Sequence, residues 1–251
     1  MRTIGIDFAA QPRETAICEI AWEGSSATLV QLSKNVTDAQ IRQLVAGPSL
    51  HAIGVDIPFG WPKDFVAFVS AQMQITAPLP VSSMEQKRLR ATDRFIRGRF
   101  PKSPLSVSTD KIGISAMRWA ALSREFGLVN RAGDGRFYEV YPAVARIVWE
   151  LSGKTDNATA LDQILEACPF NCFSPGLRSE LLVNEHCFDA LLCALVARAA
   201  ALGLTHLPPA DLLGDAEAEG WIHAPQADSL ERLVTTGLID DEALSVNPPT
   251  L

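Results

Sequence analysis

The sequence lacks an apolar run long enough to cross a bilayer. Its longest run, residues 190–204, is interrupted by Arg198, and a membrane-spanning helix needs about 20 mostly apolar residues. The first residues also lack the charged region, the apolar stretch and the small-residue cleavage site of a secretory signal. We therefore expect a cytoplasmic protein that has no membrane partner.

Cysteine is scarce and irregularly spaced. The chain has five cysteines, namely Cys18, Cys168, Cys172, Cys187 and Cys193. The pair at 168 and 172 has no second pair with which to form a zinc site. In a chain without a secretory signal, this pattern predicts free and mostly buried thiols.

Positive charge is also in short supply. The chain carries 22 Lys and Arg against 29 Asp and Glu, a net charge of −7, which argues against a protein that coats nucleic acid non-specifically. The exception is residues 87–102, where seven basic residues accompany a single acid. Arg90, Arg94 and Arg97 would share one face of an expected helix over 84–97, which suits contacts to substrate phosphates. An ordinary solvated helix face is the alternative interpretation of the same residues.

What remains is the composition of a globular protein, with 47% hydrophobic and 20% charged residues. Apolar runs bounded by turn residues predict strands, and a helix starting near residue 37 separates the third strand from the fourth. Because a strand that follows a crossover helix usually lies parallel to an earlier strand, we expect an α/β fold with a mixed sheet of about five strands. The expected strands are residues 3–9, 14–22, 27–32, 51–57 and 137–141.

The chain shows no internal repeat and no low-complexity tract. We expect a single domain over residues 1–251. Within it, residues 60–135 are predicted to be a helical insertion on the rim, and residues 226–251 a C-terminal extension.

Two of the expected strands end in the same signature. Ile4-Gly5-Ile6-Asp7 and Ile53-Gly54-Val55-Asp56 both lead from apolar residues to an aspartate. If these strands are parallel neighbours, both carboxylates emerge at the sheet edge where open α/β sheets bind ligands. Two carboxylates so close repel each other unless a proton or a cation intervenes. Mg²⁺ or Mn²⁺, which prefer oxygen ligands, is the expected cofactor, and loop capping by each Asp is the alternative.

A third acid lies near the start of the clearest expected helix, residues 185–202. Asp189 borders a stripe of small residues that would let this helix approach the sheet closely. It could instead serve only the helix dipole. His186 lies one turn earlier and is a further candidate metal ligand, with a solvated or structural role as the alternative.

Five local strings follow one another along the chain: Gly5-Ile6-Asp7-Phe8-Ala9, Gly54-Val55-Asp56-Ile57-Pro58-Phe59-Gly60, Arg90-Ala91-Thr92-Asp93, Tyr138-Glu139-Val140-Tyr141-Pro142 and Phe188-Asp189-Ala190-Leu191. The arrangement of the three aspartates resembles the ribonuclease-H-like nuclease superfamily, and the set of strings more closely resembles the family called domain of unknown function 429. That family is described as predicted nucleases with a ribonuclease-H-like fold. The resemblance implies metal ligation by Asp7, Asp56 and Asp189, and it adds Glu139 as a catalytic acid at the mouth of the site. A salt bridge to the basic segment is the alternative role for Glu139.

Three functions follow as hypotheses. The first is a metal-dependent nuclease, in which carboxylate-bound divalent ions hydrolyse phosphodiesters in nucleic acid or another phosphate-bearing substrate. The second is a non-catalytic module on the same fold that binds nucleic acid or nucleotide. The third, a phosphotransferase like actin or the sugar kinases, is disfavoured because Phe8-Ala9-Ala10 follows the first aspartate in place of small phosphate-approaching residues.

Overall fold

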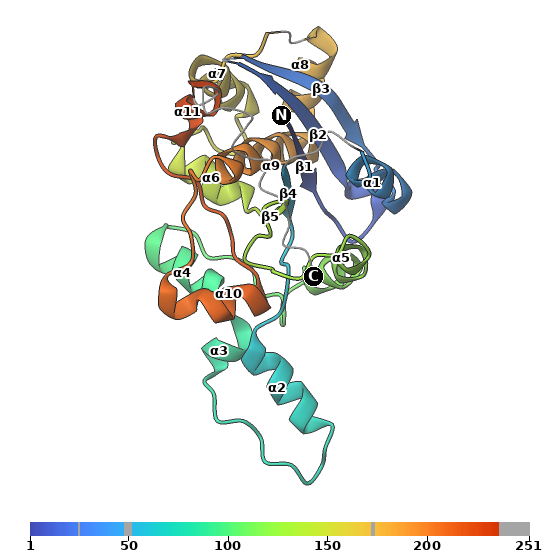
Figure 1. Ribbon diagram of the computed structural model, residues 1–251, viewed down its shortest axis with the longest axis vertical. Helices are drawn as coiled ribbons and strands as arrows, with labels where there is room; N and C mark the ends of the chain where they lie inside the picture. Colours follow the sequence, from blue (N-terminus) through green and yellow to red (C-terminus); the bar gives the residue numbers. More distant parts are fainter. Residues whose placement is uncertain (25, 48–51, 172–173, 236–251) are drawn as a thin grey trace, which may run out of the picture.

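The computed structural model describes residues 1–24, 26–47, 52–171 and 174–235 (Figure 1). Five strands form one mixed sheet in the order β3-β2-β1-β4-β5. β2 lies antiparallel to β1 and β3, whereas β4 lies parallel to β1 and β5. This confirms the expected mixed α/β sheet, whose strand order and directions are consistent with a ribonuclease-H-like fold at this coarse level. The strands are β1 (Arg2–Asp7), β2 (Ala16–Glu23), β3 (Ser26–Lys34), β4 (Ala52–Asp56) and β5 (Phe137–Glu139).

Helices cover both faces of the sheet (Figure 1). The long helix α9 packs on one face, where Ala16, Cys18 and Ile20 of β2 share a core with its apolar residues. On the other face, Ile4 and Ile6 pack against α1 and α5. The helices are α1 (Asp38–Val45), α2 (Lys63–Gln72), α3 (Met84–Arg88), α4 (Ala91–Arg99), α5 (Gly113–Glu125), α6 (Pro142–Val148), α7 (Asn157–Ala167), α8 (Pro175–Val183), α9 (Glu185–Ala201), α10 (Leu213–Glu219) and α11 (Ser229–Thr235).

Residues 60–135 run from the end of β4 to the start of β5 and contain α2 to α5. α2 and α3 extend beyond the sheet (Figure 1) and bury none of their residues. α5 differs, because its Trp119 is fully buried and packs against Phe8 and Phe59 near the ends of β1 and β4. The segment is therefore part rim and part core.

The predicted C-terminal extension and one of the five cysteines include residues outside the described ranges. Residues 236–251 of the expected C-terminal extension lie outside them, as does Cys172. The other four cysteines are buried and free, as the sequence predicts for them. Within the described ranges, the structure contains no helix long and apolar enough to span a membrane.

A buried histidine makes the fold sensitive to acid. Nε2 of His223 donates to the carbonyl of Ala132, and Nδ1 accepts from the Thr205 hydroxyl, at 2.9 and 3.0 Å. Burial lowers the pKa of His223 from 6.5 to about 4. Between these values the unfolded chain binds a proton that the folded chain does not, so stability falls as pH falls through this window.

We expect this histidine to contribute a loss of about 3 kcal/mol in unfolding free energy between pH 7 and pH 4. His223→Gln should keep a neutral polar group there and remove that part of the pH dependence. Urea unfolding of both proteins at a series of pH values measures the difference in slope. Parallel pH curves for the two proteins would show that His223 does not couple folding to protonation.

Candidate functional site

Two glycines bring the helix α9 into contact with the sheet. A Cβ added to Gly5 would lie 1.9 Å from the carbonyl oxygen of Ala190, and one added to Gly54 would lie 2.3 Å from that of Cys193. Only glycine permits so close an approach between backbones. α9 therefore lies directly over β1 and β4, on the face toward which these two glycines point.

The first two predicted acids lie side by side on that same face. Asp7 and Asp56 are direct partners in the parallel β1–β4 ladder. Because side chains alternate between faces along a strand, each Asp shares the face of the glycine two residues before it. The prediction that these two strands are parallel neighbours is confirmed. Both carboxylates thus lie beneath the start of α9, at the carboxyl ends of the strands.

The third acid, Asp189, is a residue of α9. Asn184 caps this helix by accepting a hydrogen bond from the Cys187 backbone N–H at 3.2 Å. Asp189 immediately precedes Ala190, the residue in contact with Gly5, and its side chain is 7% exposed. The structure therefore brings Asp189 to the same end of the sheet as Asp7 and Asp56.

Two basic side chains, His186 and Lys154, flank the three acids. His186 Nδ1 lies 2.6 Å from Asp7 Oδ2, and Lys154 Nζ donates to Asp189 Oδ2 at 2.9 Å. Lys154 also pairs with Glu185 on the outer side of α9. Because Nδ1 of His186 is occupied by Asp7, only Nε2 of this predicted ligand is left for a metal ion.

Electrostatics at the site are dominated by burial and by like charge. Burial raises the pKa of Asp56 well above its ordinary value, and Asp7 and Asp189 raise it further. Burial also raises the pKa of Asp7 and of Asp189, against the opposing effects of His186 and Lys154. The hydrogen bond to Asp7 in turn raises the pKa of His186. Asp56 therefore carries the least compensated negative charge of the three.

The carboxylate oxygens suit a divalent ion in their chemistry. Asp189 Oδ1 is buried and has no hydrogen-bond partner, and among the described residues no group donates a hydrogen bond to Asp56. Such oxygens are ligands that Mg²⁺ and Mn²⁺ prefer. No cluster of three or more His, Cys, Asp or Glu within the described ranges is assembled closely enough to form a metal site as it stands. The oxygen donors therefore suit such an ion in their chemistry but are not assembled as a metal site in this conformation, in which Lys154 pairs with Asp189 and His186 with Asp7.

Glu139 lies in a buried ion-pair network instead of free in the cleft. Its two carboxylate oxygens accept from Arg90 at 2.7 and 2.8 Å, and one of them also accepts from the Phe59 backbone N–H at 2.9 Å. Arg90 pairs in addition with buried Asp93. Glu139 is 2% exposed, so its geometry matches the salt bridge that was the alternative to a catalytic role.

The prediction that Arg90, Arg94 and Arg97 share one helical face is wrong. The expected helix over 84–97 is interrupted between α3 and α4, because Arg90 turns inward to Asp93 and Glu139 at the point where α4 begins. The guanidinium of Arg90 is saturated and 2% exposed. Arg94 donates to the Leu89 carbonyl at 2.6 Å, and Arg97 pairs with Glu85 on the surface.

A pocket of about 250 Å³ adjoins the carboxylates. Asp7 and Asp56 line it together with Arg90, Glu139 and Tyr141. Tyr141 lies just after the carboxyl end of β5, much as Asp7 and Asp56 lie at the carboxyl ends of β1 and β4. The argument from strand ends that identified the two aspartates could therefore have identified Tyr141 from the sequence. Burial, and then Asp56, raise the pKa of its hydroxyl to about 12. Lys154 was missed for a different reason, since no motif marks its loop.

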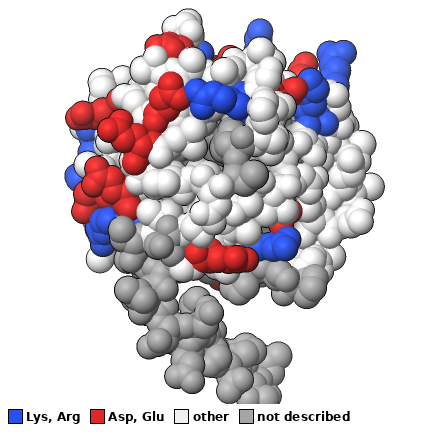
Figure 2. All heavy atoms as spheres, turned by 90° about the horizontal axis from the view of Figure 1, so that it is seen from above, with Lys and Arg blue, Asp and Glu red and all other residues white. Residues whose placement is uncertain are grey.

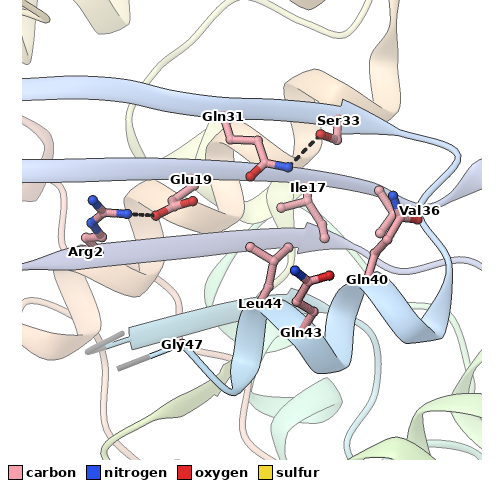
Figure 3. Close-up of a pocket in the computed structure, with 10 residues that line it drawn as sticks. All are labelled: Arg2, Ile17, Glu19, Gln31, Ser33, Val36, Gln40, Gln43, Leu44 and Gly47. Atoms are coloured by element: carbon pink, nitrogen blue, oxygen red, sulfur yellow. Dashed lines mark hydrogen bonds and ion pairs between the residues drawn. The ribbon is translucent and has the colours of Figure 1, made fainter. Parts of the chain in front are cut away.

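A larger pocket, of about 360 Å³, lies on the opposite face of the sheet beside α1 (Figure 3). Its polar side chains mostly pair with one another: Arg2 donates to Glu19 at 2.7 Å, and Gln31 donates to Ser33 at 2.9 Å. It contains none of the three predicted aspartates. We therefore place the candidate site at the smaller pocket, where acids meet the strand ends.

Comparison with known protein families gives a match over most of the chain. The family model described as "Protein of unknown function (DUF429)" matches residues 5–212. This range contains Asp7, Asp56, Asp189 and the residues that contact them. No curated protein matches the chain.

Proposed function

This chain belongs to the DUF429 family, and we propose that it is a metal-dependent nuclease acting at Asp7, Asp56 and Asp189. The observation that carries the proposal is the crowding of three carboxylates between β1, β4 and α9, whose charge His186 and Lys154 compensate only in part. Asp56 has raised pKa and two acidic neighbours, and Asp189 keeps a buried oxygen without a partner. Carboxylates arranged in this way lower the stability of the folded protein if they have only a structural role. A divalent ion bound between them would offset that loss of stability.

The three aspartates would hold the ion, which would activate a water and stabilise the leaving oxygen. Lys154 would orient Asp189 through the 2.9 Å hydrogen bond to Oδ2, which leaves Oδ1 without a partner. His186 is half exposed, and Asp7 raises its pKa. His186 would therefore hold a proton close to neutral pH and supply it at Nε2 to a departing oxygen.

A non-catalytic binding module is the second candidate, and one observation favours it. His186 and Lys154 already neutralise part of the acidic charge without any metal. No observation favours the phosphotransferase hypothesis, because backbone groups that follow Asp7 already form hydrogen bonds within the protein. The Ala9 N–H donates to Thr15, and its carbonyl accepts from Arg118, so Ala9 has no free N–H group for a nucleotide phosphate.

Mn²⁺ titration of the wild-type protein tests the proposal. At a metal concentration of 100 times Kd, binding to the folded state adds about 2.7 kcal/mol. For a chain of this size that corresponds to a rise in melting temperature of about 5 to 10 °C. Fluorescently labelled single-stranded and duplex oligonucleotides, incubated with the same metal, report cleavage on denaturing gels.

Two controls accompany the titration. EDTA should abolish both the thermal shift and the cleavage, and NaCl at equal ionic strength should produce neither. Absence of a shift and of cleavage with Mn²⁺ and with Mg²⁺ would reject the nuclease and leave the binding module. A shift without cleavage would show a metal-binding protein that lacks the proposed activity.

A further inference from the structure

The pocket beside the carboxylates differs from them in chemistry. Its remaining walls are mainly apolar, with Phe8, Ile57, Ile112 and Leu105 among the side chains that line it. Tyr141 adds a partly exposed ring at the carboxylate side. Charged acids and an apolar recess therefore lie next to each other at the ends of β1 and β4.

The described residues that line the pocket provide no free positive charge. Arg90 is the only basic residue among those that line it, and its guanidinium is taken by Asp93 and Glu139. A phosphate entering here would meet the partly buried carboxylates of Asp7 and Asp56 and no unpaired donor on Arg90, at a high desolvation cost. The group that enters must therefore be neutral, and the walls favour one with apolar faces.

The size and the rigidity of the pocket further restrict which chemical group can enter it. A volume of about 250 Å³ is below the range of about 300 to 1,000 Å³ found for drug-sized ligands, which suits one ring system. The Phe8 wall is fixed, since Trp119 packs edge-on against it at 5.5 Å between ring centroids and the Arg118 guanidinium lies 4.4 Å from its centroid. A preformed pocket of this kind binds a flat ring at low entropic cost.

We propose that this pocket seats one unpaired nucleobase of the substrate strand, whose adjoining phosphodiester then lies at Asp7, Asp56 and Asp189. The placement of the phosphodiester rests on the nuclease function proposed above. A base stacked and paired within a duplex cannot reach such a recess without being unpaired first. The substrate class is therefore single-stranded nucleic acid or an unpaired end.

The surface charge is consistent with a single-stranded substrate. On the face seen in Figure 2, acidic side chains gather mainly along the left side, and basic side chains are scattered, several of them beside an acid. Proteins that follow a duplex backbone use many basic contacts to phosphates, whereas recognition of a single strand draws much of its affinity from stacking of bases. With a net charge of −7, base contacts are the more effective source of affinity here.

The test compares two probes on the intact protein. One is a fluorescein-labelled single-stranded oligothymidylate, and the other is an oligomer of equal length whose nucleotides are abasic. Both carry the same phosphates, so a difference in binding reports the bases alone. Fluorescence anisotropy in Ca²⁺, used in place of Mn²⁺ to avoid cleavage, should show the base-bearing strand binding on the order of tenfold more tightly.

A matched pair of variants locates the effect. Leu105 is 55% exposed and lines the pocket, whereas Ile114 is 63% exposed on α5 and does not line it. Leu105→Ser should weaken binding of oligothymidylate and leave the abasic strand unchanged, while Ile114→Ser should change neither. Both positions are exposed, so both variants should fold.

The outcomes separate this inference from the proposed function. Equal binding of the two probes, or an equal effect of the two variants, would overturn the base pocket even if Mn²⁺-dependent cleavage were found. Tighter binding of oligothymidylate that Leu105→Ser abolishes would support the base pocket even if no metal shift and no cleavage occurred. In that case the protein would be a single-strand-binding module.

Discussion

Replacing Asp56 by asparagine will abolish Mn²⁺-dependent cleavage and raise the melting temperature of the metal-free protein. Burial, Asp7 and Asp189 all raise the pKa of Asp56, and Lys154 opposes them only in part. Asparagine keeps the shape and removes that charge, so the repulsion disappears. The same change removes a strong oxygen ligand. Because a catalytic ion is worth several kcal/mol, the expected loss of activity is on the order of 10³-fold.

Melting curves with and without Mn²⁺, and rates of oligonucleotide cleavage, measure both effects. Asp211→Asn is the matched control, since this exposed residue carries the same charge away from the site and should alter neither quantity. Asp7→Asn should remove the metal shift but gain less apo stability, because it also loses the 2.6 Å contact to His186. An Asp56→Asn protein that melts lower without metal and keeps its Mn²⁺ shift would contradict the metal-site interpretation.

Replacing Arg90 by methionine will destabilise the protein by about 4 kcal/mol at neutral pH. The change leaves Glu139 and Asp93 buried with their cation removed, and breaking one side of a buried ion pair costs about 3 to 5 kcal/mol. Since Arg90 opposes the effect of burial on the pKa of Glu139, that pKa should rise further in the variant. The difference from wild type should therefore shrink as pH falls and Glu139 takes up a proton.

Arg97→Met provides the matched control for this second variant. Arg97 lies on the same helix, α4, and also pairs with a glutamate, but that pair with Glu85 is about half exposed on each side. Exposed pairs contribute about 0 to 1 kcal/mol, so this variant should unfold nearly as wild type does. Urea unfolding measures both. Equal losses in the two variants would show that the buried network has no special role in stability.

This network also explains how the fold holds the candidate site. Glu139 accepts from the Phe59 backbone N–H, which fixes the turn that follows β4 and Asp56. Glu219 accepts from the backbone N–H groups of Lys63 and Ala91, which ties α10 to the starts of α2 and α4. Loss of Arg90 should therefore loosen one wall of the pocket as well as the global fold.

The sequence by itself determined the sheet and the placement of Asp7 and Asp56. Repeated apolar residues that end in Gly-x-Asp are a local signal, and strand alternation carries each aspartate to the face of the glycine before it. The same holds for Asp189, because helical periodicity and small residues place it at the start of α9, next to the contact with Gly5. The positions of these three aspartates can be inferred from the residues next to them in the sequence and from the crossover that makes β4 parallel to β1.

Only the tertiary structure decided which charged groups meet. Lys154 reaches Asp189 across 35 residues of sequence, and Arg90 reaches Glu139 across 49. Helical spacing alone predicts Arg90 on a solvated face. In the folded chain, two carboxylates turn it inward and interrupt the helix, because a charge can be buried only where partners from distant segments converge. Local periodicity contains no information about such partners, so the sequence located the aspartates but not the cations around them.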